Sequence, residues 1–181
     1  RLALDIDDVL ANFAEAVHQA FGKNIEPHDH WNPYESSGQL ILSFEPQGTP
    51  TGLREEYLDK CEHNKDFWYN LEPISLPVDI PLETVCYITA SPKNMVGVRI
   101  EWLKKHGFPT LPVIHSKNKA LTMDRLGVDV LIDDKLATVQ AVRAYEAKKL
   151  RAIHFKPWYS TQSDNTNSIT RLYKPVYPRL I

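Results

Sequence analysis

Cysteine, long apolar runs and blocks of positive charge are all scarce in this chain. Only two cysteines occur among 181 residues, which argues against a disulfide-rich secreted scaffold and favours a cytoplasmic protein. No apolar run is long enough to span a bilayer, so association with a membrane is not expected. The formal net charge is −2 and no long run of Lys or Arg occurs, so stable binding to duplex nucleic acid is not expected.

Apolar residues are present in the amount that a folded core needs. They make up 43% of the chain, as in soluble globular proteins. The length suits one domain that carries a subdomain. Composition does not decide the oligomeric state, and a homodimer stays open.

Short apolar runs alternate with helical patterns along much of the chain. The expected strands lie at residues 2–4, 85–89, 113–114, 130–132 and 150–155. The expected helices lie at residues 12–21, 91–106, 116–126 and 135–149. Strands that alternate with helices of this length predict an α/β fold, a doubly wound parallel sheet with helices on both faces.

The stretch between the first helix and the second strand has a different texture, with several prolines and one helical pattern at 53–62. We therefore expect a core formed by residues 1–14 and 77–160. A small, mainly helical cap, residues 15–76, is expected to be inserted after the first strand and helix. Residues 161–181 are expected to form a tail that packs on the core or is partly disordered.

Polar residues stand at three of the expected strand ends. They are Asp5, Asp7 and Asp8, then Thr89 and Ser91, and finally Asp133 and Asp134. Each acidic group alone has an ordinary explanation as a turn or a helix cap. Together they meet at the carboxyl edge of a parallel sheet, where such sheets bind ligands. Several carboxylates in one crevice need a cation, and oxygen ligands favour Mg²⁺.

Two lysines, Lys117 and Lys119, stand where a helix is expected to begin after Ser116. The helix dipole disfavours cations there, by roughly a few tenths of a kcal/mol each. Such a lysine either is solvated, or reaches a bound anion or the carboxylates. Ser91 and Pro92 are expected to open another helix, whose free N–H groups would bind phosphate. Carboxylates, a divalent cation, a lysine and an anion site together suit phosphoryl transfer.

These motifs resemble those of haloacid-dehalogenase-superfamily phosphatases. The matching residues are Asp5-Ile6-Asp7, Thr89, a lysine at 117 or 119, and Leu131-Ile132-Asp133-Asp134. The stretches DIDDVLANF, DFWYNLEPI, ITASP and VLIDD resemble more closely the 5′(3′)-deoxyribonucleotidases and their phage and bacterial relatives. The resemblance covers most of the chain to about Trp158, and the cap up to about Asn64 matches poorly.

The resemblance implies a role for each acid. Asp5 would be the nucleophile and would form an aspartyl-phosphate. Asp7 would protonate the leaving group and later activate water. Asp5, the backbone carbonyl of Asp7 and Asp134 would hold Mg²⁺, with Asp133 as the alternative to Asp134. Asp8 stands where the family commonly has Gly, and we expect it to tolerate replacement.

The resemblance also assigns the groups around the substrate. Thr89, with Ser91, would bind the phosphoryl oxygens. Lys119 would stabilise charge, with Lys117 as the runner-up. Phe67 and Trp68 would enclose the nucleobase, although each could instead belong to the cap's own core. Further aromatic candidates for the base pocket are Trp31, Tyr34 and Phe44.

The expected function is Mg²⁺-dependent hydrolysis of nucleoside monophosphates, with deoxyribonucleotides favoured. Whether the phosphate is on the 5′ or the 3′ oxygen stays open. One alternative is a phosphatase of the same superfamily for another small phosphoester or for a nucleic-acid 3′-phosphate. A second alternative is a non-catalytic nucleotide-binding protein on the same fold, which the presence of both Asp5 and Asp7 disfavours.

Overall fold

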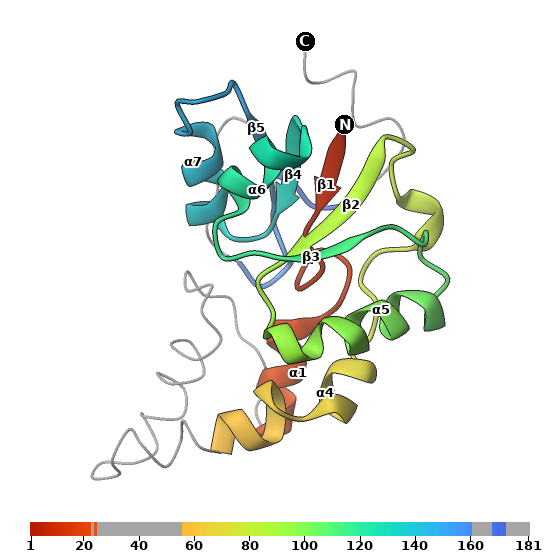
Figure 1. Ribbon diagram of the computed structural model, residues 1–181. Coiled ribbons are helices and arrows are strands. Elements are labelled where there is room, and N and C mark those ends of the chain that lie inside the picture. Colours follow the sequence, from red (N-terminus) through yellow and green to blue (C-terminus); the bar gives the residue numbers. More distant parts are fainter. Residues whose placement is uncertain (23, 25–55, 161–167, 173–181) are drawn as a thin grey trace, which may run out of the picture.

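The computed structural model describes residues 1–22, 24, 56–160 and 168–172. In this part of the chain six strands form one sheet in the order β3-β2-β1-β4-β5-β6, and every neighbouring pair is parallel (Figure 1). The strands are β1 (Leu2–Leu4), β2 (Thr84–Thr89), β3 (Val113–His115), β4 (Val130–Asp133), β5 (Arg151–Phe155) and β6 (Ser168–Ile169).

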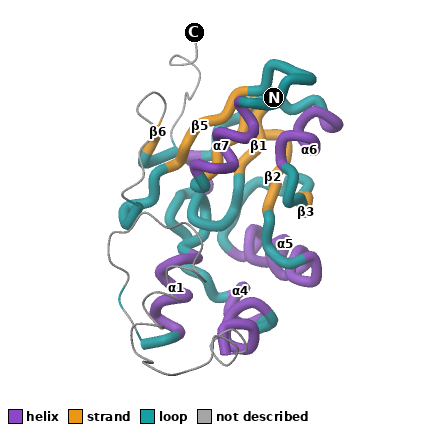
Figure 2. Tube along the Cα trace, turned by 90° about the vertical axis from the view of Figure 1, so that its left-hand side faces the viewer, coloured by secondary structure: helices purple, strands orange, loops and turns teal. Residues whose placement is uncertain are grey.

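Helices cover both faces of this sheet, which confirms the predicted α/β arrangement. The α-helices are α1 (Phe13–Ala20), α4 (Lys65–Tyr69), α5 (Val96–Lys105), α6 (Lys119–Leu126) and α7 (Leu136–Arg143). Single turns of other helix types lie at η1 (Leu58–Glu62), η2 (Pro77–Asp79) and η3 (Lys93–Met95). In both views α1 and α4 lie on the side of the molecule where β1 ends (Figures 1 and 2).

Strand β1 shows how the sheet serves two cores. Successive side chains of a strand point to opposite faces. Leu2 and Leu4 belong to the apolar cluster that contains residues of α1, α4 and α5. Ala3 belongs to the second cluster, which contains residues of α6 and α7. Because both faces are covered, β1 is apolar throughout, and this pattern made the strand recognisable in the sequence.

The helix expected to begin at Ser91 and Pro92 begins later. Pro92 has an extended backbone, with φ −54° and ψ 140°, so it does not start a helix. The 3₁₀ turn η3 follows, and α5 starts only at Val96. The expectation that Ser91 caps a helix that could bind phosphate was therefore wrong.

The next helix also begins later than expected. Asn118, not Ser116, is the N-cap of α6, and its side chain accepts a hydrogen bond from the N–H of Leu121 at 3.1 Å. Lys119 is therefore the first helical residue, while Lys117 precedes the helix. This difference gives the two lysines unlike surroundings, which the sequence pattern did not separate.

The described part of the C-terminal region adds a strand that was not expected. In β6, Ser168 and Ile169 pair with His154 and Phe155 of β5, and Leu172 is buried in the larger apolar cluster. The rest of the tail lies outside the described residues. The boundaries of the cap, residues 15–76, stay a prediction, because residues 25–55 also lie outside the described part.

The loop from β1 to α1 turns on Asp8. Its φ of 55° is in the left-handed region, which Asp tolerates better than most side chains. Its Oδ1 accepts hydrogen bonds from the N–H groups of Phe13 and Ala14, both at 3.0 Å, and these groups begin α1. Tyr159 donates a further hydrogen bond to this buried carboxyl. These contacts argue against the expectation that Asp8 tolerates replacement, because its carboxyl accepts from the first N–H groups of α1.

We predict that Asp8→Ala lowers the free energy of unfolding by about 2 kcal/mol. The substitution removes a helix cap and leaves a side chain without local hydrogen bonds at positive φ. Asp8→Asn keeps an oxygen acceptor and should lose less than half as much. Urea unfolding of both variants measures the difference. An Asp8→Ala protein as stable as the wild type would show that the cap contributes nothing.

Candidate active site

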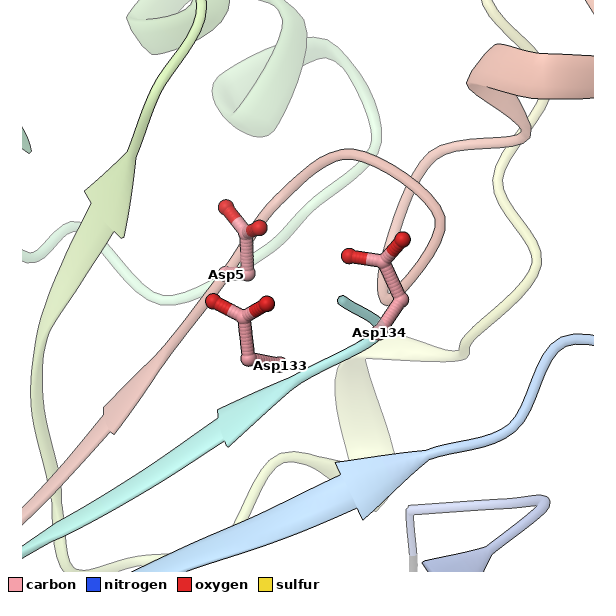
Figure 3. A group of neighbouring side chains, drawn as sticks. All are labelled: Asp5, Asp133 and Asp134. Carbon is pink, nitrogen blue, oxygen red and sulfur yellow. The ribbon is translucent and has the colours of Figure 1, made fainter. Parts of the chain in front are cut away.

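Three buried carboxylates meet where β1 and β4 end (Figure 3). Asp5 directly follows β1, while Asp133 is the last residue of β4 and Asp134 follows it. One oxygen atom of each lies within 4.8 Å of the others. The parallel pairing of β1 with β4 aligns the strand ends, and the N–H of Asp5 donates to the carbonyl of Ile132 at 2.9 Å. The structure therefore brings these predicted residues together.

The topology explains why the group is at this place. From β1 the chain continues to β2 and β3 on one side of the sheet, and β4, β5 and β6 lie on the other. The strand order thus reverses between β1 and β4. In open α/β sheets this switch point, at the carboxyl ends of the strands, is where ligands bind.

Lys119 joins two of the three carboxylates. Its Nζ lies 2.6 Å from an oxygen of Asp5 and 2.6 Å from an oxygen of Asp133, and all three side chains are buried. Burial lowers the pKa of the ammonium, but the two carboxylates outweigh burial and raise the pKa above its usual value. Lys119 is therefore a buried cation. Lys117, the runner-up, is exposed.

The carboxylates still outnumber this cation. Burial raises the pKa of Asp5 to about 7, and the charges of Asp133 and Asp7 act in the same direction against the attraction of Lys119. Burial also raises the pKa of Asp134 well above its ordinary value, and the charge of Asp133 is again the largest repulsion. A divalent cation would offset this surplus of negative charge. The donors are all carboxylate oxygens, so the site fits Mg²⁺.

Asp7 is held by a different cation. Its Oδ1 accepts a hydrogen bond from Arg99 at 2.7 Å, and its Oδ2 lies 3.3 Å from the hydroxyl of Thr89. Arg99 was not singled out from the sequence. The one signal was its spacing, because Met95, Arg99 and Trp102 recur on one helical stripe and all three are buried.

Thr89 and Ser91 form a small hydroxyl cluster beside Asp7. The two side-chain oxygens are 2.9 Å apart, and the N–H of Ser91 donates to Thr89 Oγ1 at 3.1 Å. Ser91 lines a cavity next to Asp7, whereas Thr89 is completely buried. Its hydroxyl therefore orients Asp7 and Ser91.

The cavity has a volume of about 530 Å³ and reaches from Asp5 and Asp7 to an aromatic wall. Its lining also includes Phe13, Tyr57, Glu62, Trp68, Ala90, Ser91, Pro92, Lys93, His115 and Lys117. The rings of Phe13 and Trp68 stack with centroids 4.9 Å apart. Phe67 packs edge-on against both rings.

Of the predicted base-pocket residues, Trp68 therefore lines the cavity and Phe67 supports its wall. Trp31, Tyr34 and Phe44 lie outside the described residues. Phe13 and His115 line the cavity but were not expected there. One indication for Phe13 was present in the sequence, because it ends the stretch DIDDVLANF that resembles the family. No indication for His115 was present, because its ring is positioned by a residue far away in the sequence. Its Nδ1 donates to the carbonyl of Ser91 at 2.7 Å.

The parallel sheet with its acids at the ends of β1 and β4 belongs to a phosphatase of the haloacid-dehalogenase superfamily. A family described as "5′ nucleotidase, deoxy (Pyrimidine), cytosolic type C protein" matches residues 2–165, and the chain belongs to this family. The predicted resemblance is thus confirmed, and the protein is a nucleotidase, a phosphoric monoester hydrolase. Comparisons with curated proteins and with solved structures gave no match.

Among the described residues, every helix is too short or too polar to cross a lipid bilayer.

The surroundings of the two lysines lead to a stability prediction. Lys119→Met leaves Asp5 and Asp133 buried without their cation and should lower the free energy of unfolding by about 3 kcal/mol or more. Lys117→Met changes an exposed side chain and should lower it by less than about 0.5 kcal/mol. Urea unfolding near neutral pH, with a chelator present, compares the two. Equal losses would show that the buried ion pairs do not stabilise the fold.

Proposed function

We propose that this nucleotidase hydrolyses deoxyribonucleoside 5′-monophosphates in a Mg²⁺-dependent reaction, through an aspartyl-phosphate on Asp5. The convergence of Asp5, Lys119, Asp133 and Asp134 beside a cavity with an aromatic wall carries this proposal. The family's own description names a 5′ nucleotidase and a deoxy pyrimidine compound, which supports the choice of substrate.

The proposed magnesium ligands are Asp5, Asp134 and the backbone carbonyl of Asp7. Asp133 accepts hydrogen bonds from Lys119 and from the N–H of Lys135 at 2.9 Å, which suits a residue that positions the lysine. Asp134 is therefore assigned as the direct ligand. When bound, magnesium would neutralise charge on the phosphoryl group and on the buried carboxylates.

The residues of the chain divide the reaction between them. Asp5 attacks phosphorus and displaces the 5′ oxygen of the nucleoside, which leaves the phosphoryl group on Asp5. Asp7 gives a proton to that oxygen and then takes one from the water that attacks the phosphorylated Asp5, so phosphate leaves and both acids are restored. Lys119 compensates negative charge next to the reacting carboxylate.

The cavity supports a substrate with an aromatic base. Its volume of about 530 Å³ lies within the range of small-molecule sites. We assign the base to the wall formed by Phe13 and Trp68, because small-molecule sites hold apolar and aromatic groups against apolar and aromatic side chains. Of the predicted phosphate-binding pair, Ser91 lines this cavity and is assigned to the phosphoryl oxygens. Thr89 is completely buried and is assigned to holding Ser91 in place. Lys117, which also lines the cavity, is added as a second phosphate-binding group.

An assay of phosphate release tests the reaction. The panel contains deoxyribonucleoside and ribonucleoside 5′-monophosphates, nucleoside 3′-monophosphates, sugar phosphates and 3′-phosphorylated oligonucleotides, each with Mg²⁺ or with a chelator. We expect Mg²⁺-dependent release, fastest from pyrimidine deoxyribonucleoside 5′-monophosphates. Asp5→Asn should lower kcat by at least about a thousandfold, since a nucleophile is lost.

Asp129→Asn is the control, because Asp129 precedes β4 at the opposite end from the site. It should turn over at the wild-type rate. Undiminished activity of Asp5→Asn would contradict the assigned nucleophile. Release only from sugar phosphates or oligonucleotides would favour another phosphoester as substrate, and no release at all would favour a non-catalytic binding protein.

The metal assignment is tested by titrating the protein with Mg²⁺ in a calorimeter. Asp134→Asn should weaken binding at least about tenfold, because even groups outside the ligand shell of a metal contribute that much. Asp129 flanks the other end of β4, and its side chain is 47% exposed. The Asp129→Asn protein should therefore bind Mg²⁺ as the wild type does. Equal affinity of Asp134→Asn and the wild type would exclude Asp134 as a ligand.

A further inference from the structure

We propose that Arg99 is a positioning residue of the nucleotidase, which holds the carboxyl group of Asp7 in the orientation that proton transfer requires. The inference rests on the proposed function, because it takes Asp7 as the acid and base of the reaction. It concerns a residue of helix α5 that belongs to none of the motifs recognised in the sequence.

The guanidinium of Arg99 is fixed on several sides. Its side chain is completely buried, and one terminal nitrogen donates to Asp7 Oδ1 at 2.7 Å. The other terminal nitrogen donates to the carbonyl of Trp68 at 3.2 Å. The group also lies 4.8 Å from the ring centroid of Trp102 and 5.5 Å from that of Trp68. Two directed hydrogen bonds and two ring faces leave it little freedom to rotate.

Packing alone does not account for an arginine at this place. Burying a charged group costs several kcal/mol, and buried ion pairs can often be replaced by apolar side chains without loss of stability. The neighbours on the same helical stripe, Met95 and Trp102, are such apolar residues. In the described part of the chain, the ion pair of Arg99 is with Asp7. The buried charge therefore acts on Asp7.

The direction of the hydrogen bond selects one oxygen of Asp7 for chemistry. A guanidinium donates hydrogen bonds and cannot accept them, so Oδ1 must be the acceptor. When Asp7 carries a proton, that proton is consequently on Oδ2, the oxygen 3.3 Å from the hydroxyl of Thr89. Arg99 thus fixes both the plane of the carboxyl group and the oxygen that transfers the proton.

The same arginine links this acid to the wall of the cavity. Trp68 lines the cavity, and its carbonyl and its ring both contact the guanidinium. The indole N–H of Trp68 donates to the carbonyl of Glu62 at 3.1 Å, which fixes the other side of the ring. Trp68 therefore contacts both the cavity and the group that orients Asp7.

The test compares two substrates with different leaving groups. A nucleoside 5′-monophosphate releases an alkoxide, which needs a proton from Asp7, whereas p-nitrophenyl phosphate releases a stabilised phenolate, which does not. Arg99→Met should lower kcat/KM for the nucleotide by about a hundredfold, the usual cost of misplacing a general acid. It should lower kcat/KM for p-nitrophenyl phosphate by less than about tenfold. Arg99→Lys keeps the charge, and its kcat/KM for the nucleotide should fall by about tenfold.

Lys105→Met is the matched control. Lys105 is also on α5, and its Nζ donates to the carbonyl of Tyr69 at 3.2 Å and lies 4.5 Å from the centroid of that ring. It therefore ties α5 to α4 much as Arg99 does, but its contacts are with Tyr69 and Asn70. Both values of kcat/KM should stay within about twofold of the wild type.

Asp7→Asn separates failure of the inference from failure of the proposed function. If Asp7→Asn lacks this preference for the better leaving group, Asp7 is not the general acid and the role of Asp7 in the proposed function fails. If Asp7→Asn shows the preference and the Arg99 variants lower kcat/KM equally for both substrates, only the role of Arg99 is overturned. Should Arg99→Met not fold, Arg99→Lys decides by the same criterion. Failure of both variants to fold would show a purely structural role and would also overturn the inference.

Discussion

The site depends on one constraint, that buried carboxylates repel one another and require cations. Lys119 meets it by bridging Asp5 and Asp133 at 2.6 Å each. Lys119 is on α6 and Asp133 is on β4, while Asp5 directly follows β1, so the ion pairs also join three parts of the fold. One lysine does not balance three carboxylates, and burial leaves the pKa of Asp5 raised to about 7. The remaining surplus of negative charge makes this edge of the sheet suited to a divalent cation.

A second buried cation gives the two aspartates of the first motif different surroundings. Asp5 faces Lys119 among other carboxylates, whereas Asp7 faces Arg99 and the hydroxyl of Thr89. Two acids that are two positions apart in the sequence therefore differ in charge partner and in burial. Such a difference suits the two roles that we propose, nucleophile for Asp5 and proton donor for Asp7. Asp8, the third acid, accepts from the first N–H groups of α1 and so fixes the loop from β1 to α1.

The sequence allowed most of the sheet and the acidic group to be predicted, because both depend on local patterns. β1 and β4 are short apolar runs that end in acids, and parallel pairing brings these ends together without further information. The expectations were wrong where a specific contact, or the backbone conformation of one residue, decides how the chain folds locally. The backbone of Pro92 is extended, Asn118 caps α6 in place of Ser116, and Asp8 bonds residues five and six positions later. Arg99 was missed because its partner, Asp7, is 92 residues away.

The positions of the two cations also indicate how chemistry and recognition are divided in the molecule. Lys119 lies at the edge of the sheet, among groups that every phosphate ester would meet. Arg99 is on α5, and its guanidinium contacts Asp7 and also Trp68 of α4, which is part of the aromatic wall. If Arg99 positions Asp7 as we propose, a change in the wall alters proton transfer without touching the ion pairs of Asp5. On this view the sheet supplies the phosphoryl chemistry, and the packing of α4 on α5 makes proton transfer responsive to the group that leaves.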